Sequence, residues 1–332
     1  MTYDLAGVGN ALMDALVVIQ DDSVLGDLHL ARGGTHMVAH DDWEKAYDCV
    51  RQLKVTFDSG GSCANTVATV GLLGGKAVFC GQVGDDQMGR MYGAKLDEAC
   101  GQHALRTSTD APTGKCLAII SETDAERTMV TDLGAAVSLH DLGDFDGVLK
   151  STQIGHFEGY MLMDPVARQM VIVAMEQVRK SGGRVSLDVN DPFVINAITD
   201  VLRDLIRTHV DIVFLNEDEA RALTGQDPEQ AVNTVADELG VRTVVVKMGK
   251  RGSLVKHDGT VHTIGVRTVK AIDTTGAGDA YAGGYLYGMA KGWGPDQCGD
   301  LAAAVAALTV SQIGAVVKDR IALERVLESV QS

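Results

Sequence analysis

The fold of this chain is decided by the stretch Asp273-Thr274-Thr275-Gly276-Ala277-Gly278-Asp279-Ala280. It follows a predicted strand, residues 267–272, and opens an Ala/Gly-rich helix predicted to continue to Lys291. Successive small residues let backbone amides approach a ligand closely, and a helix N-terminus directs unpaired N–H groups and a partial positive charge at it. The stretch therefore predicts an anion-binding turn suited to a phosphoryl group in transfer.

Asp279 lies in the predicted first turn of that helix. A carboxylate at this position can cap the helix, which is a purely structural role. It can instead accept a proton from an attacking hydroxyl beside the anion site, which is a catalytic role. The eight residues alone favour neither interpretation.

Short Val/Ile-rich segments alternate with helical patterns over most of the chain. The clearest helix is predicted from Asp164, a good N-cap, through Pro165 to Lys180, where Gly182-Gly183 follows. Strand–helix–strand alternation predicts a parallel sheet covered by helices on both faces. We expect its strands at residues 3–8, 76–80, 153–157, 184–189, 211–215 and 242–247.

Two stretches, residues 11–38 and 103–131, contain strand-like pieces with little helical periodicity between them. Within the second, residues 117–120 and 128–130 flank a polar turn and predict a β-hairpin. We expect the two stretches to pair as a small accessory sheet outside the main one.

A second glycine-rich segment, Ser59–Asn65, follows a predicted strand at 54–57 and precedes a predicted helix at 65–73. Gly60 and Gly61 permit close backbone approach, and the Asn65 amide can both donate and accept hydrogen bonds from hydroxyls. The alternative is a tight strand–helix turn capped by Ser62.

Asn10 and Asp14, just after the first strand, are equally ambiguous. Ligands of parallel sheets bind at the carboxyl ends of strands, so these residues and Ser59–Asn65 could reach one crevice. The usual nucleotide motifs are absent. Gly74-Gly75-Lys76 is followed by Ala77 and lacks the first glycine of a phosphate-binding P-loop, and Leu12 replaces the third glycine of a dinucleotide loop.

The net charge and the distribution of apolar residues limit the partners and the location expected for this protein. The 332 residues carry a formal net charge of −16, which argues against nucleic acid or an anionic membrane as a partner. A phosphorylated ligand would need local help from backbone amides, a few cations or Mg²⁺. No run of eighteen apolar residues and no signal-peptide pattern is present, so a cytoplasmic protein is expected.

Taken together, Gly60–Asn65, Gly84–Gly89 and Asp273–Asp279 resemble the hallmark segments of the ribokinase-like (PfkB) family of carbohydrate and nucleoside kinases. The resemblance covers essentially the whole chain, 1–332, as a single kinase domain. It implies an α/β fold with a doubly wound, mostly parallel sheet, helices on both faces and a small β-sheet lid. The lid would come from about 11–38 and 103–131.

The resemblance also implies roles for the residues that match the family's motifs. Asp279 would deprotonate the substrate hydroxyl, the amides of Gly276, Ala277 and Gly278 would form the anion hole, and Arg127 would reach the transferring phosphate. ATP and Mg²⁺ are the implied cofactors. Asn216 and Glu219 would help to hold Mg²⁺ through water.

Other implied nucleotide contacts are Lys247, Gly249, Gly252 and Thr275. The family often has threonine where this chain has Lys247, so at this implied contact the sequence departs from the family's pattern. A K⁺ site near Asp273, Thr275 and Ser311 is a further implication of the resemblance alone.

Within the family the chain is most similar to adenosine kinases, on the segments Gly9–Asp14 and Pro112–Cys116. Asp14 and Asn65 would bind the ribose 2′ and 3′ hydroxyls, leaving the 5′ hydroxyl facing Asp279. The implied substrate-binding residues are Asn10, Asp14, Gly60, Gly61, Ser62, Asn65 and Cys116. A sugar kinase for ribose, fructose or 2-keto-3-deoxygluconate is the main alternative, and an inactive nucleotide- or sugar-binding sensor is another. The protein could be a monomer or a homodimer.

Overall fold

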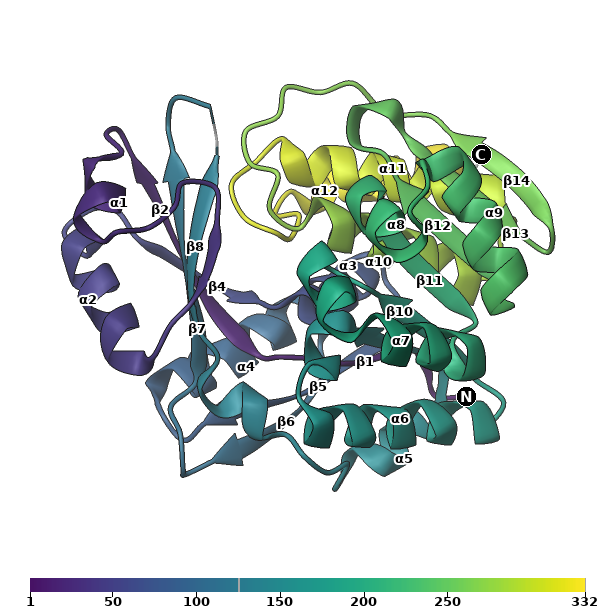
Figure 1. The fold of residues 1–332 in the computed structure, drawn as a ribbon, viewed down its shortest axis with the longest axis horizontal. Helices are drawn as coiled ribbons and strands as arrows, with labels where there is room; N and C mark the ends of the chain where they lie inside the picture. The colour runs from purple at the N-terminus through teal and green to yellow at the C-terminus, as the bar shows by residue number, and fades with distance from the viewer. Residues whose placement is uncertain (125, 332) are drawn as a thin grey trace.

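The computed structural model describes residues 1–124 and 126–331, and within them the chain builds one large and one small β-sheet (Figure 1). The large sheet has the strand order β14-β13-β12-β11-β10-β9-β1-β5-β6. Neighbouring strands from β6 to β12 are parallel, and β13 and β14 continue the sheet antiparallel. Their bounds are β1 Tyr3–Val8, β5 Ala77–Gly84, β6 His103–Ser108, β9 Thr152–Glu158, β10 Arg184–Asp188, β11 Ile212–Asn216, β12 Thr243–Lys247, β13 Ser253–His257 and β14 Thr260–Ile264.

Helices cover both faces of this sheet, because parallel strands need crossover connections. Along β1, Ala6 and Val8 contribute to the core under one layer of helices, and Leu5 contributes to the core under the other. The first layer is α5 Phe145–Leu149, α6 Pro165–Lys180, α7 Pro192–His209, α8 Glu217–Thr224 and α9 Pro228–Leu239. The second is α3 Ser62–Leu72, α4 Gln87–Cys100, α10 Ala277–Ala290, α11 Pro295–Val310 and α12 Arg320–Gln331.

The order of the strands reverses beside β1. From β1 the chain proceeds to β5 and β6 on one side, and then returns to β9 on the other side and continues to β12. The connections after β1 and β9 therefore diverge, which leaves a crevice at the carboxyl ends of these strands. Asn10 follows β1, and Glu158 is the last residue of β9.

The small sheet, with α1 and α2, projects to the left of the large sheet in Figure 1. Its order is β3-β8-β7-β2-β4. One face packs on α2 through Trp43, whereas Asp14 and Leu16 alternate onto the opposite face, which we call the cleft face. The bounds are β2 Leu12–Ile19, α1 Ser23–Asp27, β3 Thr35–Met37, α2 His40–Val50, β4 Thr56–Gly60, β7 Gly114–Ser121 and β8 Arg127–Asp132.

The fold class predicted from the sequence is confirmed, and six predicted strands occur within a few residues of their expected positions. The helix predicted from Asp164 is also present, with the Asp164 carboxylate accepting from the amides of Val166 and Ala167 at 2.9 and 2.8 Å. The β7–β8 hairpin is antiparallel, as expected.

Three expectations need correction. Residues 103–108 do not belong to the lid, because this segment follows α4 directly and pairs in parallel with β5 in the large sheet. The lid instead gains β4, which pairs with β2. The strand predicted at 267–272 is wrong, since Val269 and Ile272 are each 43% exposed and have no sheet to pack against.

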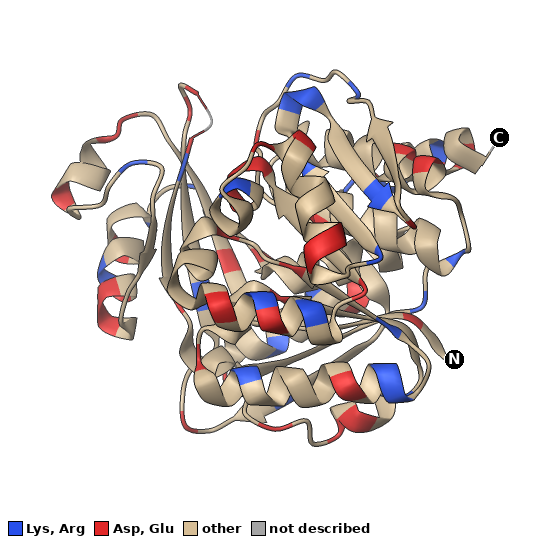
Figure 2. Cartoon of the chain, turned by 45° about the vertical axis from the view of Figure 1, so that its right-hand side comes forward, with Lys and Arg blue, Asp and Glu red and all other residues tan. Residues whose placement is uncertain are grey.

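Acidic and basic residues are interspersed along the helices in Figure 2, and Asp and Glu outnumber Lys and Arg by 45 to 29. None of the helices within residues 1–124 and 126–331 is both long enough and apolar enough to cross a bilayer. Attraction of a phosphorylated ligand therefore depends on cations and amides placed at one site rather than on the overall charge.

Candidate active site

The start of α10 is the turn that the sequence predicts to bind an anion. Gly276 caps the helix with φ 69°, and a Cβ atom built on it would lie 2.5 Å from the Ala315 side chain. Glycine is therefore required here both for the left-handed backbone and for the close approach of the next segment. Ala277 N–H donates to the Thr274 carbonyl at 3.3 Å. The amide of Gly278 is among the first in the helix, which lack an intrahelical acceptor.

Asp279 lies in the first turn of α10, and its carboxylate is turned toward α3. Oδ1 accepts a hydrogen bond from Ser62 Oγ at 2.6 Å, and Oδ2 accepts one from Asn65 Nδ2 at 2.9 Å. Burial raises the pKa of Asp279, and the two hydrogen bonds oppose that rise by favouring the ionised form. The sequence left open whether Asp279 caps its own helix, but its side-chain bonds reach a different helix.

The two glycines before α3 let the segments that are predicted to bind substrate approach each other. Gly61 has φ 98°, and a Cβ atom on it would lie 2.2 Å from the Asn10 carbonyl oxygen. A Cβ atom on Gly60 would lie 2.2 Å from the Asp14 carboxyl carbon. The sequence predicted that some group approaches this pair of glycines closely, and these groups are the Asn10 carbonyl and the Asp14 carboxylate. Any side chain at either position would push the lid strand β2 away from α3.

Asn65 carries an unsatisfied polar atom. The residue is 5% exposed, and its Oδ1 is buried without a hydrogen-bond partner in the part of the chain that the structure describes. A buried acceptor without a partner costs about 1–3 kcal/mol. A ligand hydroxyl donating to this oxygen would remove that cost, so the atom fits the substrate contact predicted for Asn65.

Asp14 lies on the cleft face of β2, opposite Asp58 of β4 and Cys116 of β7. Burial and the neighbouring Asp58 raise the pKa of Asp14 to about 7, while Arg127 opposes the rise. Arg127 begins β8 opposite Ile120, which places it on the same cleft face. Burial raises the pKa of the Cys116 thiol to about 12, so this residue is a neutral neighbour of Asp14.

A second group of charges lies at the carboxyl ends of β10, β11 and β12. Lys247 Nζ donates to Asp188 Oδ2 at 2.8 Å, and a Cβ atom built on Gly278 would lie 3.1 Å from the same ammonium. Burial and the charge of Asp188 raise the pKa of Glu219 above its usual range, and Lys247 opposes the rise. Asn216 and Glu219 form a capping box at the start of α8.

The balance of charge in this group suits a divalent cation. Asp188, Glu219 and Asp279 all interact electrostatically with the ammonium of Lys247, so the group contains more carboxylates than cations. Carboxylate oxygens are ligands that Mg²⁺ accepts, and Mg²⁺ usually keeps several waters. No cluster of three or more His, Cys, Asp or Glu arranged to hold a metal is found in residues 1–124 and 126–331. Both Glu219 oxygens already accept from Asn216, from its N and Nδ2 at 2.8 and 2.5 Å, so Asn216 and Glu219 fit an ion held through water better than one held directly.

The remaining predicted contacts lie near this group or at the glycine-rich turn. Gly249 and Gly252 form the turn between β12 and β13, with φ 54° and 85°. Asp273 is fully buried, and its two oxygens accept from the Thr275 and Gly314 amides at 2.9 Å each. Ser311 Oγ donates to the Leu308 carbonyl at 2.7 Å. Asp273 thus already has a structural role in shaping the turn before Gly276.

The sequence reasoning missed Glu158, Asp188 and Asn190. Each lies at or just after the carboxyl end of a predicted parallel strand, and a polar residue ending an apolar run there was a usable signal. Asn190, with φ 73°, donates from Nδ2 to Ser62 Oγ at 2.8 Å. It therefore supports the hydroxyl that bonds to Asp279.

Glu158 links the two segments that are predicted to bind substrate. Its Oε1 accepts from Asn10 N and Nδ2 at 2.9 and 2.7 Å, and its Oε2 accepts from Cys63 N at 3.0 Å. The residue is 1% exposed, and burial raises its pKa to about 7. One carboxylate thus holds both the loop leading into the lid and the first turn of α3.

Glu158→Gln should raise the KM for the hydroxyl substrate about tenfold and change kcat less. One carboxylate oxygen that accepts from a backbone N–H would be replaced by an NH₂ group, which cannot accept, so the segments around Asn10 and Cys63 would be held less firmly. Steady-state kinetics measure the split between KM and kcat. Glu324→Gln is a matched control, because it makes the same change at an exposed glutamate of α12. An equal loss of kcat and KM in Glu158→Gln, or no change, would contradict the positioning role.

Comparison with known proteins agrees with this architecture. The family described as pfkB family carbohydrate kinase matches residues 36–320. An adenosine kinase of Saccharomyces cerevisiae is 26% identical, with 95% of this chain and 96% of that protein covered. A solved structure of a probable sugar kinase from Rhizobium etli CFN 42 superposes with a TM-score of 0.90 at 28% identity, covering 99% and 98% of the two chains.

The structure of the adenosine kinase from Sinorhizobium meliloti superposes with a TM-score of 0.88 at 29% identity, covering 98% and 99% of the two chains. Sugar kinases and nucleoside kinases are thus similar to this chain to nearly the same degree, over nearly its full length. The chain belongs to the pfkB family of carbohydrate kinases, and it is an ATP-dependent kinase of a sugar or a nucleoside.

Proposed function

We propose that this kinase transfers the γ-phosphoryl group of ATP to the primary hydroxyl of a ribose-containing metabolite, with the 5′ hydroxyl of adenosine as the first candidate. The observation that carries the proposal is the pair of bonds from Ser62 and Asn65 to the Asp279 carboxylate. They join the proposed substrate-binding segment to a carboxylate in the first turn of the helix proposed to bind the phosphoryl group.

In the proposed reaction the substrate oxygen forms a bond to the γ-phosphorus as the bond from that phosphorus to the β,γ-bridging oxygen breaks. The hydroxyl proton passes to the Asp279 carboxylate, and ADP leaves with the bridging oxygen. Amides at the start of α10 stabilise the charge on the transferred group, with Arg127 of the lid as a second contributor. Closure of the lid excludes water and so limits hydrolysis of ATP.

Asn216 and Glu219 are the residues that would hold Mg²⁺ through water, and the bound ion would neutralise charge on the ATP phosphates. A K⁺ ion beside Asp273, Thr275 and Ser311 belongs to the proposal as well. At Asp273 the ion would have to share the carboxylate oxygens with the amides of Thr275 and Gly314, which already donate to them.

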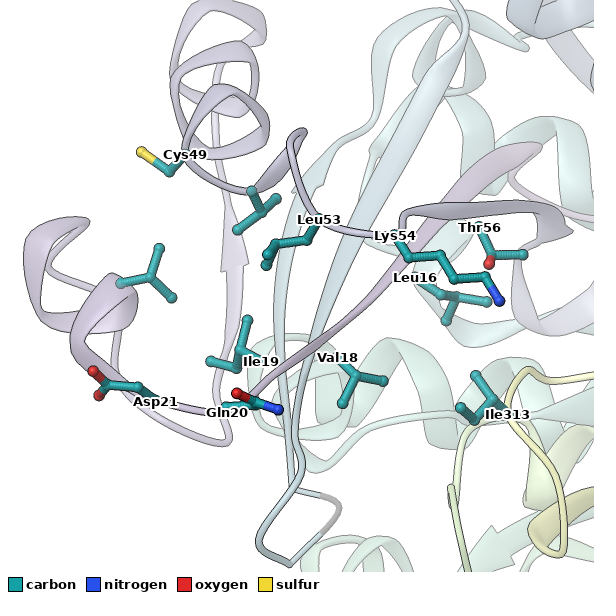
Figure 3. Close-up of a pocket in the computed structure, with 12 residues that line it drawn as sticks. Leu16, Val18, Ile19, Gln20, Asp21, Cys49, Leu53, Lys54, Thr56 and Ile313 are labelled. Atoms are coloured by element: carbon teal, nitrogen blue, oxygen red, sulfur yellow. The ribbon is translucent and has the colours of Figure 1, made fainter.

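One feature supports a nucleoside over a plain sugar, and it lies on the cleft face of β2. A pocket of about 600 Å³ at the far end of β2, where Figure 3 shows Val18 and Ile313 among the lining residues, is lined by none of the proposed substrate contacts and does not bear on this choice. Leu16 and Val18 share the cleft face with Asp14, so apolar surface lies two and four residues from the proposed hydroxyl contact. A base could occupy such surface, whereas a sugar would leave it uncovered.

A panel of adenosine, inosine, ribose, fructose and 2-keto-3-deoxygluconate tests the proposal, with ADP formation followed and products identified by mass spectrometry. Adenosine turnover with AMP as the product is the expected result. Turnover of a sugar alone would replace the nucleoside assignment with a sugar kinase. Binding of ATP or adenosine without turnover of any compound would indicate the sensor instead.

A further inference from the structure

Lys247 occupies an unusual place for a buried lysine. It is the last residue of β12, at the same sheet edge as Asp188 and Asn216, and its side chain is 15% exposed. Its ammonium bonds to Asp188 and lies against the backbone of Gly278, where a Cβ atom would come within 3.1 Å. A fixed cation thus lies beside the turn that would receive the transferred phosphoryl group.

The ammonium also has unused hydrogen-bonding capacity. A lysine carries three N–H donors, and within the described residues the structure gives Lys247 one partner, Asp188. Lys256 on the neighbouring strand β13 is the contrasting case, because its ammonium bonds to Asn233 Oδ1 and to both carboxylate oxygens of Asp237 at 2.7–3.0 Å. Lys256 is fully satisfied by the protein, whereas Lys247 has two donors left for a ligand.

Local charge keeps this lysine protonated. Burial alone would favour the neutral amine, but Asp188, Glu219 and Asp279 outweigh it and raise the pKa of Lys247. Phosphate oxygens are the natural acceptors for its remaining donors.

We infer that Lys247 is a further catalytic residue, whose ammonium contacts the γ-phosphoryl group at the start of α10 and stabilises the charge that the group carries during transfer. The inference rests on the proposed function and deepens it. It assigns a direct side-chain contact at a position where the sequence departs from the threonine that is common in the family. Asp188 is then the positioning residue that aims the ammonium.

A second consequence concerns the base. Lys247 opposes the rise in the pKa of Asp279, so its removal should raise that pKa further. Asp279 accepts a proton only when ionised, so the acidic limb of kcat/KM should then move to higher pH. The titratable groups that face Asp279 are Asp14 of β2, Cys63 of α3, Glu158 of β9, Tyr160 of the turn after β9, Asp188 of β10 and Lys247 of β12. Lys247 is the cation of this set.

The test compares Lys247→Met and Lys247→Arg with Lys256→Met, the matched control, in Mg²⁺-containing buffer. Calorimetric titration with ATP and with ADP is the first readout and does not depend on turnover. Lys247→Met should weaken ATP binding about 10- to 100-fold, the loss expected for a charge-assisted hydrogen bond, and should weaken ADP binding much less. Lys247→Arg should retain part of the preference for ATP.

The second readout is kinetic. Lys247→Met should lower kcat about 10- to 100-fold and shift the acidic limb of kcat/KM to higher pH, whereas Lys256→Met should leave both unchanged. If Lys247→Met matches Lys256→Met in nucleotide binding, kcat and pH profile, the inference is overturned while the kinase assignment stands. If the unaltered protein turns over no compound of the panel, the proposed function fails, and the ATP-against-ADP comparison still decides the role of Lys247.

Discussion

Asp279→Asn should lower kcat on the order of 10²–10⁴-fold, and this loss should exceed any rise in the KM of either substrate. Asparagine has nearly the same shape, and its Oδ1 can still accept from Ser62, but its amide group would face the Asn65 amide where Oδ2 now accepts, and it cannot take the hydroxyl proton. Steady-state kinetics with the active compound of the panel give kcat and KM. Circular dichroism and the thermal midpoint establish that the variant is folded.

Asp164→Asn is the matched control, because Asp164 is an aspartate at a helix start that does act as a cap. Asparagine caps a helix about as well as aspartate, so this variant should keep full activity. Near-normal turnover in folded Asp279→Asn would show that another group takes the proton. A large loss in both variants would indicate damage to the fold rather than to the chemistry.

The contrast between these two aspartates explains what the sequence could predict. Asp164 is recognisable because its capping hydrogen bonds go to amides only two and three residues further along the chain. Asp279 bonds to Ser62 and Asn65, 217 and 214 residues away. No local pattern encodes such a contact, so the residues alone left cap and base equally open. The resemblance to the family supplied the pairing of the two glycine-rich segments.

The difference between local and long-range information also explains which strands the sequence predicted and which it did not. Strands β1, β11 and β12 are buried on both faces and appear in the sequence as largely apolar runs, whereas β9 and β10 are equally buried but carry several polar residues. The edge strand β6 is half-buried along most of its length and has no such run, so it was assigned to the lid. Residues 267–272 contain β-branched residues whose side chains face solvent, and composition alone could not reveal that exposure.

Within the candidate site, the sequence could predict that other groups pack closely against the glycines. It could not predict which groups these are. Gly60 accommodates the Asp14 carboxylate and Gly278 accommodates the Lys247 ammonium, and both neighbours come from distant strands. Glu158 and Asp188 could have been found from their strand-end positions. Their roles follow only from hydrogen bonds that the assembled sheet creates.

Asp14→Asn should raise the KM of the hydroxyl substrate on the order of 10²-fold and change kcat less. A carboxylate that accepts two hydroxyl donors loses roughly 1.5–3 kcal/mol for each charged hydrogen bond that is weakened, and the amide replaces only part of that loss. The measurement is the KM of the substrate at saturating ATP. Asp58→Asn removes the neighbouring carboxylate without touching the proposed contact, and it serves as the control.

The pH dependence of this KM gives the sharper test. Burial and Asp58 raise the pKa of Asp14 to about 7, so the carboxyl gains a proton as the pH falls below 7. A protonated carboxyl is a weaker acceptor, and the substrate KM should therefore rise between pH 7.5 and 5.5. In Asp14→Asn the KM should be high and flat over this range. In Asp58→Asn the rise should begin at a lower pH, because the pKa of Asp14 falls when its like-charged neighbour is removed. A rise that persists unchanged in Asp14→Asn would instead belong to Glu158, whose pKa burial also raises to about 7, and Asp14 would then have no part in the titration.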